Sequence, residues 1–189
     1  MQMSSSLFFA SSNKNKFKEA STILSGFGIS LEFFKCKLQE IQTNSLEEVA
    51  QHKARQAFSF CSKPVIVEDD GLFISSLKGF PGPYSSFALD TIGNKGILKL
   101  LSKQRGATFR SIIAYCEKEE NVVLFGADVH GKISKKIQGS KWGFDPIFVP
   151  EGQTLAYSQI KNKNIISHRY LALKKFANWY LHKKKSNGL

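Results

Sequence analysis

The sequence has few cysteines, and they are not arranged for a disulfide framework or a zinc site. Cys36, Cys61 and Cys116 are far apart in 189 residues, with no C-x-x-C pair and no histidine at metal-ligand spacing. Small disulfide-bonded domains and zinc sites use closely spaced cysteines. We therefore expect reduced, structural cysteines in an intracellular protein.

Long apolar runs are also missing. No stretch approaches the roughly 20 apolar residues that cross a bilayer. The first six residues are polar and do not resemble a signal peptide. The sequence predicts a soluble, cytoplasmic protein that does not associate with membranes.

Acidic residues are scarce, with 15 Asp and Glu against 27 Lys and Arg and a net charge of +12. Such a charge attracts nucleic acid, a membrane surface or a polyphosphate, and does not distinguish among them. Arginine occurs only at positions 55, 105, 110 and 169. Because bidentate contacts to guanine favour Arg over Lys, sequence-specific DNA reading is not expected.

Length and composition are those of a globular protein. The chain is 42% hydrophobic and 22% charged, and it contains no internal repeat and no low-complexity linker. A length in the range of one domain predicts a single domain over residues 1–189. The lysine-rich end, 183–189, is expected to be a flexible basic tail.

The first third of the chain alternates apolar runs with helical patterns. Strands are expected over 7–10, 31–36 and 64–67. A helix is expected after the turn at 11–13, from the helical spacing of Phe17 through Leu24 until Gly26, and a second over 45–60, opened by a capping box at Ser45. This alternation predicts an α/β protein whose sheet begins with parallel strands and carries helices on its faces.

The rest of the chain predicts hairpins and a final helix. A helix is expected over 91–101, and extended segments over 109–116, 122–130 and 132–137, with turns at 119–121 and at Gly131. From Ser167, a plausible N-cap, one apolar stripe of a last helix is formed by Leu173, Phe176, Ala177, Tyr180 and Leu181.

Three acids adjoin at Glu68-Asp69-Asp70, directly after the apolar strand 64–67. Acids at the carboxyl end of a buried strand face the crevice where ligands of α/β sheets bind. Adjacent carboxylates repel one another unless a cation neutralises them, and carboxylate oxygens suit Mg²⁺. The alternative is a solvated Asp-Asp-Gly turn, and this segment alone does not decide between the two.

Two more segments have the chemistry of an anion or nucleotide site. Residues 11–16, Ser-Ser-Asn-Lys-Asn-Lys, open a helix whose free backbone N–H groups can bind phosphate, although a Walker loop is absent and an ordinary N-cap is the alternative. In Trp142-Gly143-Phe144-Asp145 a base can stack on an aromatic ring while Asp145 accepts hydrogen bonds from it; a core role is the alternative.

Lys163, His168 and Arg169 place further cations and an imidazole at the start of the last helix. A single histidine is usually structural. A histidine beside an arginine at a helix N-terminus is better placed to meet an oxygen-bearing ligand.

Together these segments resemble the inosine triphosphate pyrophosphatase family. The resemblance runs in order from about Leu7 to Phe176. Its matching segments are Ser11-x-Asn13-x-x-Lys16, Glu40-Ile41-Gln42 with 46–50 and Lys53-Ala54-Arg55, Val67-Glu68-Asp69-x-Gly71-Leu72, Leu77-x-Gly79 through Ser85, Trp142 through Phe148, and Lys163-Asn164-x-x-Ser167-His168-Arg169.

The resemblance implies an elongated mixed sheet with flanking helices and a central nucleotide-binding cleft, and a homodimer. It implies a Mg²⁺-dependent hydrolase that converts ITP, dITP or XTP into the monophosphate and pyrophosphate. Asp69 would activate water, and Glu40 and Asp69 would bind the metal. The implied phosphate-binding residues are Ser11, Ser12, Asn13, Lys16, Lys53 and Lys163. The base would be recognised by Phe144 and Asp145 with His168 and Arg169. Trp142 and Gly143 are further candidate substrate-binding residues.

The chain departs from the family pattern at two positions. Asp70 stands where the family usually has Ser or Thr, and we keep it as a candidate substrate-binding residue. Tyr157, in Thr154-Leu155-Ala156-Tyr157, stands where the family has Glu. Two other functions remain open: a basic nucleic-acid-binding protein without catalysis, against which the acidic cluster counts, and a related pyrophosphatase for pyrimidine or modified nucleotides.

Overall fold

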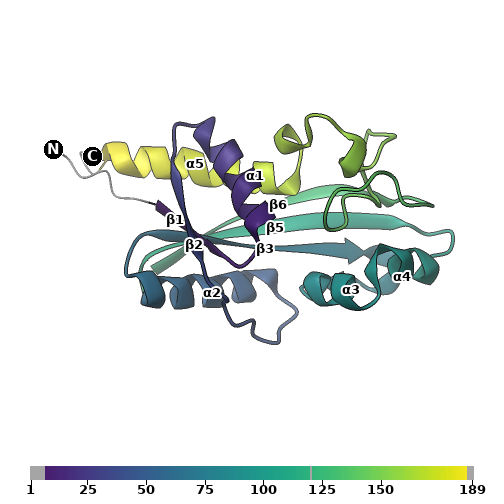
Figure 1. The fold of residues 1–189 in the computed structure, drawn as a ribbon, viewed down its shortest axis with the longest axis horizontal. Helices are drawn as coiled ribbons and strands as arrows, with labels where there is room; N and C mark the ends of the chain where they lie inside the picture. Colours follow the sequence, from purple (N-terminus) through teal and green to yellow (C-terminus); the bar gives the residue numbers. More distant parts are fainter. Residues whose placement is uncertain (1–6, 120, 187–189) are drawn as a thin grey trace.

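The structure is a computed structural model and describes residues 7–119 and 121–186. Residues 1–6, Glu120 of the predicted turn and residues 187–189 of the predicted tail lie outside the described residues. One mixed sheet runs through the elongated molecule in the order β2-β1-β3-β5-β6-β7, with β4 also paired to β3 (Figure 1). Its strands are β1 (Leu7–Ser11), β2 (Leu31–Lys35), β3 (Val65–Ile74), β4 (Pro81–Gly82), β5 (Gly106–Lys118), β6 (Asn121–Ile133) and β7 (Phe148–Pro150).

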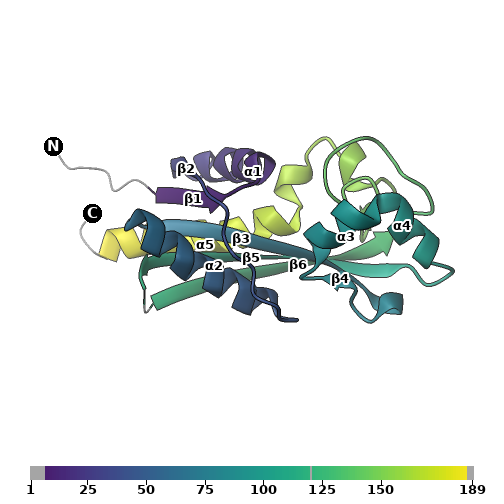
Figure 2. The same ribbon diagram turned by 60° about the horizontal axis from the view of Figure 1, so that its bottom comes forward.

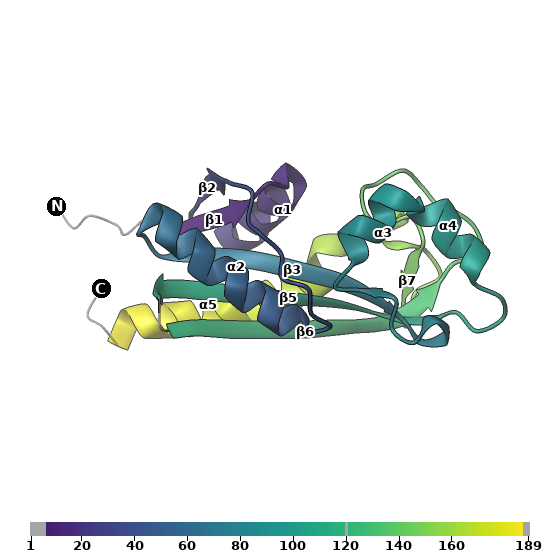
Figure 3. The ribbon, with the colours of Figure 1, turned by 90° about the horizontal axis from the view of Figure 1, so that it is seen from below.

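Helices cover both faces of the sheet. α2 packs on one face of β3 and β5, α5 packs on the opposite face of β5 and β6 beside α1, and α3 and α4 lie at the far end (Figures 1 and 3). The α-helices are α1 (Lys14–Ser25), α2 (Leu46–Cys61), α3 (Ser85–Thr91), α4 (Gly93–Leu100) and α5 (His168–Ser186). Short 3-10 helices are η1 (Ser75–Leu77), η2 (Tyr157–Gln159) and η3 (Lys163–Ile165). Within the described ranges, no helix combines the length and apolar character needed to cross a bilayer.

The alternating first third forms as predicted. β1 pairs in parallel with β2 and with β3. Asn13 caps α1 and Ser45 caps α2, each through a side-chain oxygen that accepts from backbone N–H groups of the first turn. The α/β class with a mixed sheet and flanking helices is confirmed.

The last helix has the predicted apolar stripe and is longer than predicted. The Ser167 hydroxyl accepts from the Tyr170 N–H at 3.1 Å, as an N-cap does. Leu173, Phe176, Ala177 and Tyr180 are buried against α1 and the sheet, and Leu181 is partly buried there. α5 continues to Ser186, where a flexible tail was expected from residue 183, because Lys183 pairs with Glu117 and lies over Tyr115 and Trp179.

The middle of the chain differs from the prediction at two places. The helix expected over 91–101 forms as α4, but α3 over Ser85–Thr91 was not expected; Gly93, whose φ of +60° is the left-handed conformation that glycine adopts readily, separates the two helices. β6 continues through Gly131, where a turn and a new segment over 132–137 were expected. A Cβ at Gly131 would lie 2.3 Å from the Val149 carbonyl oxygen, so this glycine allows β7 to approach β6.

The most consequential difference is the length of β3. β5 pairs with it continuously from Val65↔Cys116 to Ile74↔Ala107, so Glu68-Asp69-Asp70 lies inside a strand. The expected end of the strand at Val67 is wrong, and so is the alternative of a solvated turn. Pairing with a distant segment overrides the local turn preference of Asp-Asp-Gly.

The other edge of β3 is only partly covered. β1 pairs with it at Val65 and Ile66, and β4 at Leu72 and Phe73. Between them, residues 67–71 of β3 have no strand partner on that edge within the described part of the chain. β1 with α1 and β4 with α3 therefore stand on either side of a gap in the sheet (Figure 2).

Candidate active site

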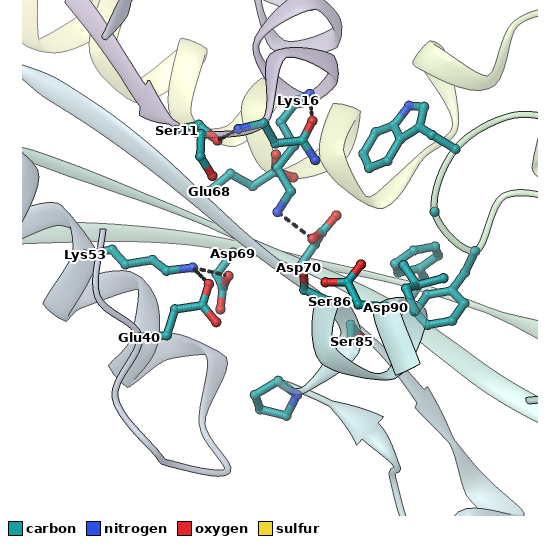
Figure 4. Close-up of a pocket in the computed structure, with 18 residues that line it drawn as sticks. Ser11, Lys16, Glu40, Lys53, Glu68, Asp69, Asp70, Ser85, Ser86 and Asp90 are labelled. Atoms are coloured by element: carbon teal, nitrogen blue, oxygen red, sulfur yellow. Dashed lines mark hydrogen bonds and ion pairs between the residues drawn. The ribbon is translucent and has the colours of Figure 1, made fainter. Parts of the chain in front are cut away.

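A cavity of about 270 Å³ lies at the open edge of β3 (Figure 4). The segments that contribute to it are the end of β1, the start of α1, the chain before and within α2, β3, α3 with the residue Pro83 before it, β5, and the loop before β7. Its lining residues are Ser11, Ser12, Asn13, Lys16, Glu40, Lys53, Glu68, Asp69, Asp70, Pro83, Ser85, Ser86, Leu89, Asp90, Phe109, Trp142, Gly143 and Phe144. The volume is near the lower end of the range of small-molecule sites, roughly 300 to 1,000 Å³.

The alternation of side chains along β3 sends the three acids to opposite faces of the sheet. Ile66 packs in the core beneath α1 and α5, whereas Val65 and Val67 pack in the core beneath α2. By the same alternation Glu68 and Asp70 point toward α1 and α5, and Asp69 points toward α2. Because the gap is open to both faces, all three reach the same cavity (Figure 4).

On the α2 side, Lys53 joins two predicted metal ligands. Its ammonium lies 2.5 Å from Glu40 Oε1 and 2.9 Å from Asp69 Oδ1. Burial raises the pKa of Asp69, and the neighbouring Lys53 and Lys16 offset this only in part. Asp69 is therefore more basic than Asp70, as a group that takes a proton from water requires.

On the opposite side, Asp70 joins two cations. Its Oδ1 lies 2.6 Å from the ammonium of Lys16, and its Oδ2 accepts from Arg169 Nη2 at 2.9 Å. Burial works against ionisation of Asp70, but the cations Lys16 and Arg169 hold its pKa well below the usual range. Asp70 is therefore a fixed negative charge at neutral pH.

Arg169 connects α5 to β3 and α1. Its guanidinium is 1% exposed, and its Nε donates to both oxygens of Glu68, at 2.8 and 2.9 Å. Ser111 on β5 also donates to Glu68, at 2.8 Å, and Arg169 Nη1 donates to Glu19 on α1. A buried guanidinium held by three carboxylates keeps its charge and its orientation.

The predicted phosphate loop forms the N-terminus of α1. Asn13 Oδ1 accepts from the backbone N–H groups of Asn15 and Lys16, and Ser11 Oγ accepts from the Asn13 N–H at 3.0 Å. These side chains order the loop, so Asn13 is also the ordinary N-cap that was the alternative. Ser11, Ser12 and Asn13 nevertheless line the cavity, where the positive end of the helix favours an anion.

Aromatic rings form one part of the cavity wall. Trp142, Phe144 and Phe109 line it. His168 stacks on Phe109, with ring centres 3.9 Å apart and an interplanar angle of 16°. These rings have the flat apolar faces that a nucleobase stacks on, and the ammonium of Lys163 lies 5.5 Å from the centre of the Trp142 ring.

Four of the predicted base- and phosphate-binding residues lie behind the cavity wall. Asp145, Lys163, His168 and Arg169 are 1 to 4% exposed. Lys163 lies 2.6 Å from Asp145 and 3.3 Å from Glu19, and burial raises the pKa of Asp145 despite Lys163. Both ring nitrogens of His168 are buried without a hydrogen-bond partner, and burial lowers the pKa of His168, so the ring is neutral.

Sequence reasoning missed several residues that meet here. Glu19 accepts from Arg169, from Trp142 Nε1 at 3.1 Å and from Lys163. Its position three residues after Lys16 on a predicted helix was a usable signal, because such residues share a face. Phe109 and Asp90 carry no local signal, since the pairing of β5 and the position of α3 bring them to the cavity.

Tyr157 is fully buried between Phe148 and Phe109. Its hydroxyl has no hydrogen-bond partner among the described atoms, and its ring lies 5.7 Å from the ammonium of Lys163. The carboxylates that hold Lys163 are thus Asp145 and Glu19, and Tyr157 contributes an aromatic face.

Comparison with known proteins agrees with this arrangement. The Ham1 family matches residues 7–179. The chain belongs to this family. A dITP/XTP pyrophosphatase of Methanopyrus kandleri is 45% identical over 179 residues, which cover 92% of this chain and 95% of that protein. The enzyme of the same name from Methanothermobacter marburgensis is 45% identical over 177 residues, 91% of this chain and 94% of the relative.

The fold of this Ham1 chain is also that of solved structures. A HAM1 protein from Coxiella burnetii superimposes with a TM-score of 0.81 at 26% identity, over 94% of this chain and 98% of the other. The family membership expected from the ordered motifs is thereby confirmed.

Proposed function

We propose that this protein hydrolyses non-canonical purine nucleoside triphosphates, namely dITP, XTP and ITP, to the monophosphate and pyrophosphate. The observation that carries the proposal is the cavity at the open edge of β3, which is lined jointly by Asp69, the N-terminus of α1 and aromatic rings. Relatives named dITP/XTP pyrophosphatase, which match almost the whole chain, support the same activity.

The donors present fit a magnesium ion held jointly with the substrate. Glu40 and Asp69 direct oxygens to one point, now shared by the ammonium of Lys53. The described residues contain no group of three or more metal-binding side chains, so Mg²⁺ would use these carboxylates with phosphate oxygens and water, as it commonly does. When bound, the ion would neutralise charge on the triphosphate.

Residues of the chain provide proton transfer and phosphate binding. Asp69 takes a proton from the water that attacks the α-phosphate, because its raised pKa and its position in the cavity suit a general base. Lys16 and the α1 N-terminus bind the leaving pyrophosphate portion, and Lys53, released from Asp69 and Glu40 when the ion is bound, binds phosphate. Positioning and charge neutralisation dominate, and no covalent intermediate is needed.

Base selection would depend on the aromatic rings and the donors behind them. Phe144 and Trp142 stack the base, and Arg169 with neutral His168 donates to the 6-oxo group of hypoxanthine or xanthine. Adenine presents an amino donor there and would leave these donors unpaired. Since Arg169 and His168 are buried, opening of the wall near Trp142 is part of this proposal.

A pyrophosphate-release assay with a nucleotide panel tests the activity. Purified protein with ITP and Mg²⁺ should release IMP and pyrophosphate in equal amounts, and ATP should be a much poorer substrate. Absence of turnover with every purine triphosphate would contradict the proposal. Faster turnover of a pyrimidine or modified nucleotide would instead support the related pyrophosphatase.

We also propose that the enzyme is a homodimer that binds no nucleic acid specifically. Light scattering after gel filtration gives the molar mass in solution. Binding to long nucleic acid that weakens steeply with salt and increases with chain length would favour the alternative function. The expected cytoplasmic location stays a prediction.

A further inference from the structure

We propose that Asp70 is a built-in competitor of the substrate, which occupies Lys16 and Arg169 until a nucleotide replaces it at both. This inference rests on the proposed function, because it assumes that the cavity binds a nucleoside triphosphate. It assigns to Asp70 a role in specificity that is separate from the roles of Glu40 and Asp69.

On the side of the phosphate loop, Asp70 is the ion-pair partner of Lys16, a proposed phosphate-binding residue. Its Oδ1 is 2.6 Å from the ammonium of Lys16, and both side chains are largely buried, with 15% and 13% exposed. Within residues 7–119 and 121–186, no other carboxylate lies within ion-pair distance of Lys16. A phosphate that binds Lys16 must therefore displace Asp70 or share the ammonium with it.

The second oxygen of the Asp70 carboxylate contacts Arg169 and His168, the residues proposed to recognise the base. Asp70 Oδ2 accepts from Arg169 Nη2 at 2.9 Å and lies 3.7 Å from His168 Nε2. The other guanidinium nitrogens of Arg169 are held by Glu68 and Glu19. A base that accepts a hydrogen bond from Arg169 Nη2 must therefore displace Asp70 from this nitrogen.

The location of Asp70 makes this competition selective. A buried carboxylate beside a phosphate costs energy because like charges repel strongly where water is scarce. Tripolyphosphate alone replaces Asp70 only at Lys16, and a nucleoside alone replaces it only at Arg169. A nucleoside triphosphate replaces Asp70 at both cations in a single binding event, so Asp70 discriminates against free phosphates and nucleosides.

Calorimetric titration of the protein with tripolyphosphate in EDTA tests this without turnover or metal. Asp70→Asn keeps the shape of the side chain and removes its charge. We expect it to bind tripolyphosphate at least about tenfold more tightly than the unchanged protein, the size of one lost charge repulsion. Asp90→Asn is the matched control, because Asp90 lines the same cavity without an ion pair to a described cation. It should tighten binding by less than roughly threefold.

The outcomes separate this inference from the proposed function. Unchanged or weaker tripolyphosphate binding in Asp70→Asn overturns the inference, and so does an equal gain in Asp90→Asn, which would indicate a general charge effect. In a Lys16→Met background Asp70→Asn should tighten binding less, because no ammonium is released; an undiminished gain would also overturn the inference. If Asp70→Asn fails to fold, Asp70→Ser serves in its place, with circular dichroism as the check. Hydrolysis of ITP by the unchanged protein, measured separately with Mg²⁺, shows whether the proposed function holds.

Discussion

Asp69 and Asp70 are neighbours in the sequence and opposites in the structure. Asp69 points toward α2, where burial raises its pKa, and Asp70 points toward α1 and α5, where cations hold its pKa low. Environments that separate the pKa values of two carboxylates assign them different tasks. The α2 side of β3 is suited to proton transfer and metal binding, and the α1 and α5 side to holding the recognition residues in place.

The two sides also differ in how they are held together. On the α2 side a single lysine joins Asp69 to Glu40, whose side chain is 55% exposed. On the other side Arg169 joins β3, α1 and α5 through three carboxylates. Changes on the first side should therefore affect catalysis more than stability, and changes on the second should affect both.

The largest effect is expected for Asp69→Asn. It should lower kcat by about 10²- to 10⁴-fold, because a positioned general base contributes that much. Stability should not fall, since burial already disfavours the charged form. Steady-state pyrophosphate release and urea unfolding measure the two quantities. A near-normal kcat would show that another residue is the general base. A large loss of stability would show that the α2 side is as important for stability as the side of α1 and α5.

Arg169→Met should have the largest effect on stability. Removing the guanidinium leaves Glu68 charged and unpaired in the interior, which costs about 3 to 5 kcal/mol in the free energy of unfolding. The double variant with Glu68→Gln should recover part of that loss, and urea unfolding of both variants checks it. Equal stability of the two variants would show that the unpaired carboxylate is not the cause.

Local patterns were sufficient to predict part of the fold and most of the cavity lining. The phosphate loop depends on the cap at Asn13, and the last helix on its apolar stripe, and both features are local. The extent of β3 is not local. Asp-Asp-Gly favours a turn, and only the pairing with β5, some 40 residues further on, extends the strand through it.

The same limit explains the residues that were missed. Phe109 reaches the cavity through the register of β5 on β3, where it is opposite Leu72. The approach of β4 to β3 depends on Gly71, where a Cβ would lie 2.6 Å from the Gly82 carbonyl oxygen, and it brings α3 with Asp90 to the cavity. No spacing in the sequence encodes these contacts. The burial of Lys163, His168 and Arg169 behind the wall depends in the same way on tertiary packing.

The opposite pKa shifts predict opposite pH dependences of stability, measured in EDTA. The pKa of Asp70 is depressed, so its contribution is present above the unfolded value of about 3.9 and is lost as the pH falls through the folded pKa. The pKa of Asp69 is raised, so its ionisation lowers stability as the pH rises from about 3.9 through the folded pKa.

Urea unfolding at several pH values between acid and neutral measures the free energy of unfolding of the unchanged protein and of the Asp69→Asn and Asp70→Asn variants. On acidification, the stability advantage of the unchanged protein over Asp70→Asn should shrink. Its stability relative to Asp69→Asn should rise. Parallel changes in the two comparisons would show that the two carboxylates share one environment.

The smallest effect on stability is expected for Glu40→Gln. Glu40 is more than half exposed, and ion pairs of this kind contribute about 0.2 to 1 kcal/mol, so the free energy of unfolding should change by no more than that. Because Glu40 is a proposed metal ligand, the same variant should need more Mg²⁺ for half-maximal pyrophosphate release. Glu48→Gln, a similar change on the exposed side of α2, is the control and should leave the Mg²⁺ requirement unchanged. If Glu40→Gln has the Mg²⁺ requirement of the unchanged protein, the α2 side binds the metal through Asp69 without Glu40.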